Sequence, residues 1–131
     1  MSQVYLDSCV LIYRIEGAEP HNGSSERALM SLGSSRACIS PLVRVECLVK
    51  PIRLNDSSLR ATYEGLLSVF DLLPLSAEVF DLATELRALH GLKTPDALHS
   101  ACAIHHGCDQ IWTNDDRLRH VSGRIAVRII G

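Results

Sequence analysis

The sequence predicts an α/β sandwich built on a largely parallel β-sheet. Short apolar segments alternate with longer segments of helical periodicity along the whole chain, which is typical of strands joined by crossover helices. Residues that cap or stop helices separate these segments. The 131 residues, 47% hydrophobic and 21% charged, are enough for one domain with its own core.

The first quarter of the chain reads as strand, helix, loop and helix. Residues 3–6 are apolar and β-prone, and Ser8 is positioned to cap the helix that follows. Residues 17–23 contain two Gly, a Pro and an Asn, which predicts a loop. The next helix should begin at Ser24 or Ser25, since serine favours the N-cap position.

The middle of the chain repeats this pattern. Residues 36–40 form a short strand, and Ser40 caps a helix with Pro41 in its first turn, where proline is tolerated. This helix should stop before Pro51, because an internal proline removes a backbone hydrogen-bond donor. Residues 55–58 (NDSS) then cap another helix with an apolar face.

The last third of the chain completes the sheet. Residues 69–75 are apolar and should form a strand, and Ser76 begins a helix that Gly91 ends. The remaining elements are a helix from Thr94 to Gly107, a strand at 110–113, a helical turn at 115–120 and a strand at 125–130. Strands separated by helices favour parallel pairing.

Composition excludes several classes of protein. Lys and Arg number 13 and Asp and Glu 15, so the formal net charge is −2 and any contact with nucleic acid must be local or made through cations. The five cysteines include no CxxC motif, which favours reduced, mostly buried thiols. An early acid and no basic residues at the N-terminus argue against a signal peptide, and no apolar run spans a bilayer. We expect a soluble cytoplasmic protein.

Four acids lie where a parallel sheet would gather them. Asp7 and Asp115 directly follow predicted strands, whereas Glu46 and Asp96 lie in helices. Taken singly, Asp7, Asp96 and Asp115 are explained as helix caps or turn residues. Glu46 is not, because its helix PLVRVECLVK is apolar and a carboxylate near such a face needs a partner, a metal or a cleft.

Together, these acids indicate a metal site. In open parallel sheets the functional site lies outside the carboxyl ends of the strands, where the four side chains would converge. Clustered carboxylates repel one another and need a cation to stay ionised. Oxygen ligands suit Mg²⁺, with Mn²⁺ as the alternative, and such sites serve phosphoryl-transfer and nuclease chemistry.

Four segments give the chain a resemblance to a known family over essentially its whole length. They are VYLDSCVLIY, SPLVRVECL, LKTPDALHSACAIHHGCD and IWTNDDRL, and each carries one of the four acids. In this order they resemble the PIN-domain ribonucleases, specifically the VapC toxins of type II toxin–antitoxin pairs. The resemblance implies a single PIN domain over 1–131, a three-layer sandwich whose mostly parallel sheet of four or five strands is flanked by helices.

The resemblance also implies the make-up of the active site. The expected catalytic residues are Asp7, Glu46, Asp96 and Asp115, with Asp7, Asp96 and Asp115 as ligands of Mg²⁺ and Thr113 and Ser8 in support. The chain departs from the family at position 117, where many relatives have a second acid and this sequence has Arg117. A second metal position is therefore not implied.

Basic residues near these segments are candidates for binding RNA. We expect contacts from Arg14, Lys93, Arg117 and Arg119, which flank the acids in the sequence. No histidine is placed near the acids as an obvious base, which favours hydrolysis of an RNA phosphodiester by metal-activated water over attack by the 2′-hydroxyl.

A zinc site is the weaker interpretation of the histidines and cysteines. His99, Cys102 and His106 share a helix face by spacing, but no second ligand cluster lies at the expected distance. We therefore expect these residues to form a polar helix surface and a buried thiol.

The resemblance further implies partners: an RNA substrate, a second copy of the chain, and a cognate antitoxin whose basic C-terminal tail competes with Mg²⁺. Helices at 41–50 and 56–67 are candidates for the homodimer interface. The alternative function is a catalytically silent PIN-like module that binds a basic peptide. An aspartyl-phosphate phosphatase is disfavoured because position 9 is Cys9 rather than Asp, and a receiver domain because no adjacent acids follow the first strand.

Overall fold

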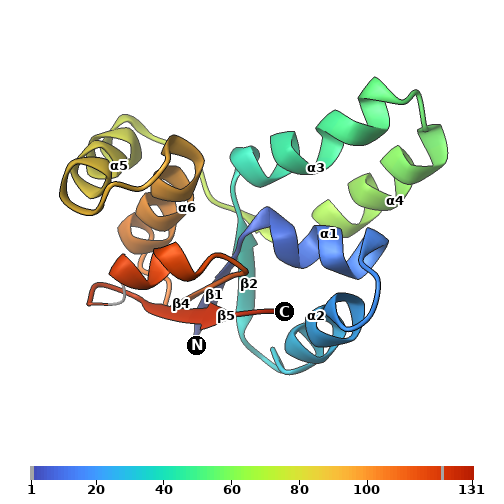
Figure 1. Ribbon diagram of the computed structural model, residues 1–131, viewed down its shortest axis with the longest axis horizontal. Coiled ribbons are helices and arrows are strands. Elements are labelled where there is room, and N and C mark those ends of the chain that lie inside the picture. Colours follow the sequence, from blue (N-terminus) through green and yellow to red (C-terminus); the bar gives the residue numbers. More distant parts are fainter. Residues whose placement is uncertain (1, 122) are drawn as a thin grey trace.

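The computed structural model describes residues 2–121 and 123–131, and these residues form a five-stranded, all-parallel sheet (Figure 1). The strands lie in the order β3-β2-β1-β4-β5. Their bounds are β1 Gln3–Leu6, β2 Arg36–Ile39, β3 Asp71–Leu72, β4 Gln110–Thr113 and β5 Ala126–Ile129. The predicted α/β class and parallel sheet are confirmed, and β1 is the central strand.

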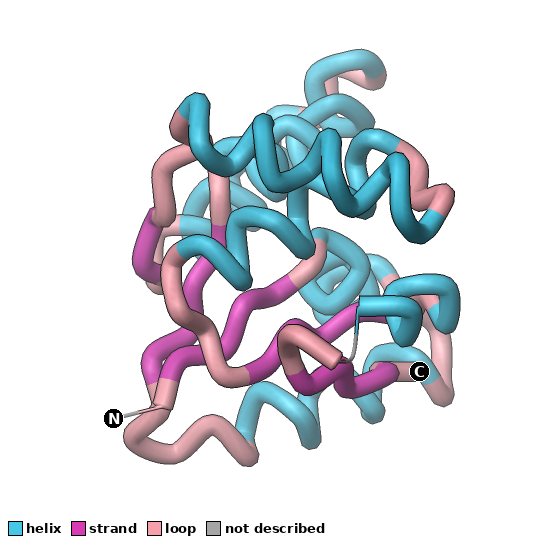
Figure 2. Tube along the Cα trace, turned by 90° about the vertical axis from the view of Figure 1, so that its left-hand side faces the viewer, coloured by secondary structure: helices cyan, strands magenta, loops and turns pink. Residues whose placement is uncertain are grey.

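Helices cover both faces of this sheet. Their bounds are α1 Ser8–Glu16, α2 His21–Met30, α3 Pro41–Arg53, α4 Ser57–Leu67, α5 Ala77–His90 and α6 Thr94–His105, followed by the 3₁₀ helix η1 Asp116–Val121. Helix α1 packs on α2, α3 and α4, whereas α5 packs on α6 and η1. The chain moves along the sheet in one direction to β3 and then returns to β4, so right-handed crossovers place the two groups on opposite faces. In Figure 2 the magenta strands accordingly lie between cyan helices.

The start of the chain differs from the sequence prediction at two helix ends. Asp7, rather than Ser8, is the N-cap of α1, with an extended backbone and a side chain that accepts from the Ser8 amide. Helix α2 begins at His21, inside the predicted loop. The Asn22 side-chain amide donates to the carbonyl of Tyr13 at 3.2 Å and to that of Arg14 at 2.8 Å, so it ties the start of α2 to the end of α1.

The elements α3 and β3 also differ from their predicted lengths. Helix α3 continues through Pro51, which is buried in the last turn. Proline has a helical φ, so the helix can continue past Pro51 at the loss of the one backbone hydrogen bond that an N–H there would have donated. Strand β3 is an edge strand in which only Asp71 and Leu72 pair with β2, so most of the apolar 69–75 segment lies outside the sheet.

The core lies on both faces of the sheet and positions its carboxyl edge. Tyr5 and Leu6 of β1, Leu11 of α1 and Ile111 of β4 are fully buried. All five cysteines are free thiols, and four of them are buried. Among the described residues, every helix is too short or too polar to cross a membrane.

Candidate active site

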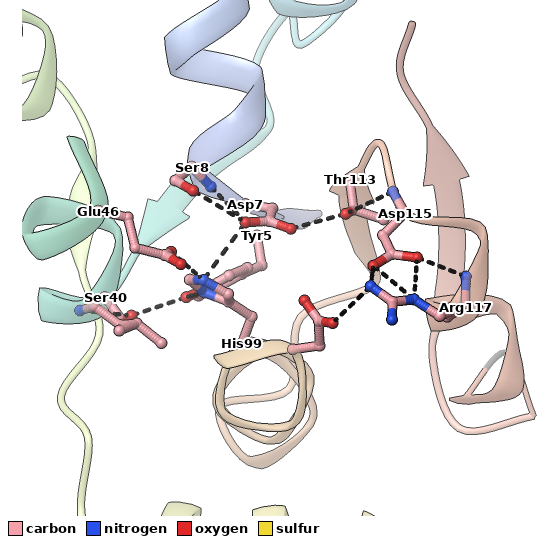
Figure 3. A network of polar contacts seen from close by, with 11 residues as sticks. Tyr5, Asp7, Ser8, Ser40, Glu46, His99, Thr113, Asp115 and Arg117 are labelled. Atoms are coloured by element: carbon pink, nitrogen blue, oxygen red, sulfur yellow. Dashed lines mark hydrogen bonds and ion pairs between the residues drawn. The ribbon is translucent and has the colours of Figure 1, made fainter. Parts of the chain in front are cut away.

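Asp7 lies at the carboxyl end of the central strand, and its buried carboxylate is held from two sides (Figure 3). Its Oδ1 accepts a hydrogen bond from the Ser8 amide at 2.7 Å, and its Oδ2 accepts one from Thr113 Oγ1 at 2.8 Å. The register of β1 and β4 pairs Leu6 with Trp112, which places the next residue on each strand side by side. The two residues expected to support the site therefore both contact Asp7.

Glu46 and His99 meet beside Asp7. The His99 Nε2 atom lies 2.6 Å from Glu46 Oε1 and 3.4 Å from Asp7 Oδ1. The His99 side chain is 1% exposed and that of Glu46 is 30% exposed. The expectations that no histidine lies near the acids, and that His99 belongs to a polar helix surface, are wrong. Helix α6 is buried at every position from Ala97 to Ala103, so its polar residues face the interior.

Two further buried hydroxyls lie behind His99. The Tyr5 hydroxyl is 2.7 Å from His99 Nδ1 and 2.8 Å from Ser40 Oγ, and both side chains are fully buried. Ser40 is also the N-cap of α3 and accepts from the Leu42 amide at 3.3 Å. The imidazole is thus connected to β1 and to the start of the helix that carries Glu46.

Asp115, Asp96 and Arg117 form the other half of the site. Arg117 Nη2 lies 2.6 Å from Asp115 Oδ2 and 3.7 Å from Asp96 Oδ2, and Arg117 Nε donates to Asp115 Oδ1 at 3.0 Å. Thr113 Oγ1 accepts from the Asp115 amide at 3.2 Å, so one hydroxyl connects the two halves. Arg117, expected to bind RNA, therefore bridges two of the four acids.

The local charges move pKa values in different directions. Burial, followed by the negative charges of Asp115 and Asp7, raises the pKa of Asp96. The hydrogen bond from Arg117 lowers the pKa of Asp115. Burial acts to lower the pKa of His99, but the hydrogen bond to Glu46 and the negative charges of the surrounding carboxylates raise it above its ordinary value. Each half of the site thus contains one basic side chain supplied by the protein itself, His99 in one half and Arg117 in the other.

The donor atoms fit a divalent cation near Asp7. Asp7, Glu46 and His99 each offer one ligand atom, and these atoms lie within 4.8 Å of one another. The Asp96 carboxylate lies on the same guanidinium as that of Asp115, since Arg117 Nη2 is 3.7 Å from Asp96 Oδ2 and 2.6 Å from Asp115 Oδ2. The carboxylate oxygens of this group suit Mg²⁺, whereas both ring nitrogens of His99 are already engaged, by Glu46 and by Tyr5.

The other basic residues expected to bind RNA lie at different distances from the acids. Lys93 lines a small cavity of about 60 Å³ together with Asp96 and Arg117. Arg14 instead lines a shallow groove between α1 and α4. Arg119 pairs at 3.2 Å with the exposed Asp116, which begins η1. The structure therefore brings Lys93 and Arg117 to the acids, and places Arg14 and Arg119 in other surroundings.

The sequence analysis does not place His99 in the site, although the spacing of neighbouring residues contains a signal for it. Asp96 and His99 are three residues apart, which puts them on one side of a helix. Tyr5 and Asp7 are two residues apart, which puts them on one face of an extended strand. Cys102 of α6 and His106, the C-cap of α6, lie against the carbonyl of Pro74 instead, at 4.0 Å and 2.9 Å.

Comparisons with known proteins agree with this architecture. The fold is similar to that of VapBC2 from Rickettsia felis bound to a promoter DNA fragment, with a TM-score of 0.82 and 18% identity over 98% of this chain and 99% of that one. It is also similar to DNA-bound VapBC from Salmonella typhimurium, with a TM-score of 0.79 and 21% identity over 98% of each chain. For VapC20 of Mycobacterium tuberculosis, described as a Sarcin-Ricin loop cleaving toxin, the TM-score is 0.75 and the identity 17%, over 95% of this chain and 98% of that one.

At these identities the structural likeness is one of fold, and no curated protein sequence matches the chain. The sequence does match the PIN domain family, over residues 4–124. This match spans nearly the whole chain and includes all four acids gathered at the carboxyl edge of the sheet. The chain therefore belongs to the PIN domain family.

Proposed function

We propose that residues 1–131 form one PIN domain that acts as a Mg²⁺-dependent endoribonuclease, the toxin of a type II toxin–antitoxin pair. The observation that carries this proposal is the convergence of Asp7, Glu46, Asp96 and Asp115. They come from four distant segments of the chain and end in two adjacent groups around Thr113 and His99. Such a concentration of carboxylates in a protein of this family supports a metal-dependent nuclease site.

In this proposal Asp7, Asp96 and Asp115 would hold Mg²⁺, with Mn²⁺ as a substitute. The bound cation would neutralise charge on the scissile phosphate and acidify an attacking water. The chain's own residues prepare the site. Ser8 and Thr113 fix both oxygens of Asp7, so this carboxylate has a single orientation before any ligand arrives. Such preorganisation avoids rearrangement during the reaction.

Glu46 is the proposed proton acceptor. Its carboxylate is partly exposed, unlike that of Asp7, so a water molecule can reach it from solvent. Asp115 is less suited to this role, because its pKa is lowered by Arg117 and its oxygens are already engaged. The proton would therefore leave the attacking water towards Glu46.

Basic residues on the rim would position the RNA. Lys93 and Arg117 lie beside Asp96, close enough to hold phosphates that flank the scissile bond. Arg14 and Arg119 would contact the RNA farther along its backbone. Local basic groups of this kind reconcile RNA binding with the net charge of −2.

The proposed partners follow from the family and from the apolar surface. The similar structures from Rickettsia felis and Salmonella typhimurium are VapBC complexes bound to DNA, so we propose a cognate antitoxin with a basic tail for this chain. We also propose a homodimer in the cytoplasm. Val45, Val49 and Ile52 of α3 are each about half exposed and are candidates for its interface.

Incubation of the purified protein with cellular RNA tests the function. We expect cleavage in Mg²⁺, no cleavage in EDTA, and no cleavage by Asp96→Asn. Attack by water leaves a 5′-phosphate and a 3′-hydroxyl, whereas a 2′,3′-cyclic phosphate would overturn the mechanism. The absence of cleavage of any RNA would overturn the proposed activity.

The second candidate is a catalytically silent module that binds a basic peptide. The pairing of Arg117 with Asp115 favours it, because it demonstrates that this pocket accommodates a guanidinium group. Tight binding of an arginine-containing peptide without any Mg²⁺-dependent cleavage would support this alternative.

A further inference from the structure

The buried side chain of His99 connects the two helical layers at the site. It lies on α6, its Nε2 faces Glu46 of α3 and Asp7 at the end of β1, and its Nδ1 faces Tyr5 of β1 (Figure 3). Its ring is 1% exposed, so water does not compete for these contacts.

The direction of one hydrogen bond follows from the chemistry of the partners. An ionised carboxylate can only accept, so the 2.6 Å contact with Glu46 places a proton on His99 Nε2. In the neutral ring, Nδ1 accepts from the Tyr5 hydroxyl, which accepts in turn from Ser40. In the doubly protonated ring, both of these bonds reverse. In either case Nε2–H donates to Glu46.

Glu46 depends on this bond for its orientation. Its side chain has several rotatable bonds and is 30% exposed, and His99 is its sole hydrogen-bond partner within the described parts of the chain. Arg44, its neighbour on α3, pairs with Glu64 at 2.6 Å instead. Without His99, the Glu46 carboxylate would be free to swing into solvent.

We propose that His99 is a positioning residue that acts through Glu46. Its Nε2–H holds the Glu46 carboxylate beside Asp7, and the hydroxyls of Tyr5 and Ser40 hold the imidazole. The effect of His99 on cleavage rests on the proposed ribonuclease function. The hydrogen bond itself does not, and it can be measured separately.

Kinetics test the effect on cleavage. His99→Leu fills the buried space but cannot donate, so we expect kcat to fall about 10–100-fold with little change in KM, the usual range for partners that orient an active-site ligand. His99→Gln places an amide donor near the position of Nε2 and should recover most of kcat. An unchanged kcat in His99→Leu would overturn the proposal.

A double-mutant cycle separates positioning from a general structural effect. If His99 acts through Glu46, then His99→Leu should cost less than about 2-fold in kcat in a Glu46→Gln background, because interacting residues are not additive. A full additive loss would contradict the proposal. If His99→Leu does not fold, Tyr5→Phe removes one hydroxyl from the same network. We expect it to lower kcat several-fold, and an unchanged kcat would equally count against the network.

Nuclear magnetic resonance provides a readout without RNA. We expect a slowly exchanging imidazole N–H proton from His99 that disappears in His99→Gln and shifts in Glu46→Gln. Imidazole signals that are unchanged in Glu46→Gln would overturn the inference, whatever the activity. Should the wild-type protein cleave no RNA, the proposed function would fail, and these signals would still decide whether His99 holds Glu46.

Discussion

Arg117 forms a two-point contact with Asp115: Nη2 lies 2.6 Å from Oδ2, and Nε lies 3.0 Å from Oδ1. The contact raises the pKa of Arg117 and lowers that of Asp115. The same guanidinium lies 3.7 Å from Asp96. Four carboxylates need positive charge nearby in order to ionise together, and here the chain supplies part of that charge itself.

This contact predicts that removing Arg117 strengthens metal binding. In Arg117→Gln the site loses a competing positive charge a few ångströms from its acids. We expect Mn²⁺, used as the probe in calorimetry at low salt, to bind about 3–10-fold more tightly, the size expected for one partly screened charge. Arg119→Gln is the matched control, because Arg119 pairs with the exposed Asp116. If Arg117→Gln and Arg119→Gln changed the Mn²⁺ affinity equally, Arg117 would not be the charge that competes with the metal.

Lys93 should contribute to RNA affinity through charge alone. In an Asp96→Asn background that cannot cleave, Lys93→Gln should weaken RNA binding and reduce the slope of log affinity against log salt by about 1. The control is Arg36→Gln, since Arg36 begins β2 at the opposite end of the sheet and pairs with Asp71 at 2.8 Å. An unchanged salt dependence for Lys93→Gln would place this residue outside the RNA path.

Asp96→Asn should stabilise the metal-free protein. The folded state raises the pKa of Asp96, so it binds a proton more tightly than the unfolded state does. The stability of the wild type therefore falls as pH rises above the ordinary Asp range near about pH 4, and the Asn variant escapes this loss. We expect a gain of up to about 1 kcal/mol at neutral pH after solvent screening, or a few degrees in Tm.

Thermal unfolding in EDTA at about pH 7 and about pH 4 measures this difference. The gain should be larger at the higher pH. A variant that is less stable than the wild type at neutral pH would indicate that Asp96 is favourably paired, and not repelled, in the metal-free site.

Thr113→Val should destabilise the fold. The substitution keeps the shape of a fully buried side chain but removes the hydroxyl that donates to Asp7 and accepts from the Asp115 amide. Leaving a buried acceptor without its partner costs about 1–3 kcal/mol. Thr113→Ser keeps the hydroxyl, and its cost should stay below about 1 kcal/mol. Urea denaturation of both variants checks the prediction, and similar losses would argue against the hydrogen bonds.

Val49→Asp should dissociate the proposed homodimer. Val49 is 50% exposed on α3 and borders a groove of about 510 Å³ that Val45, Leu48 and Ile52 also line. We expect light scattering to give twice the monomer mass for the wild type and the monomer mass for the variant. Leu89→Asp, on the exposed face of α5, is the control and should leave the dimer intact. A monomeric wild type would remove the dimer from the proposal.

Much of the architecture could be predicted because its signals are local. The N-caps Ser40, Asp56 and Ser76 and the left-handed Gly91 lie where the sequence predicts helix ends. Strand β3 could not be predicted from apolar residues alone, because its length depends on how much of β2 is available to pair. The early start of α2 depends on a contact between Asn22 and the end of α1, which no local pattern reveals.

The candidate site likewise contains residues that the sequence predicts and residues that only the folded structure brings together. The four acids could be proposed because strand ends and family motifs mark them. For His99 the sequence offers only its spacing from Asp96, because its partner Glu46 lies 53 positions away on another helix and packing decides that the two side chains meet. The contact of Arg117 with Asp115 likewise depends on the turn between β4 and η1.

The hydrogen bond between Thr113 and Asp7 joins residues 106 positions apart. One edge of strand β1 pairs with β4, and this edge stays unpaired until residues 110–113 are present. Contacts of such long sequence separation form late in folding, and during synthesis they require that the chain has been made through β4. A growing or prematurely ended chain would carry Asp7 and Glu46 but no assembled pocket. The proposed nuclease would thus remain inert until β4 and the residues that follow it have been synthesised.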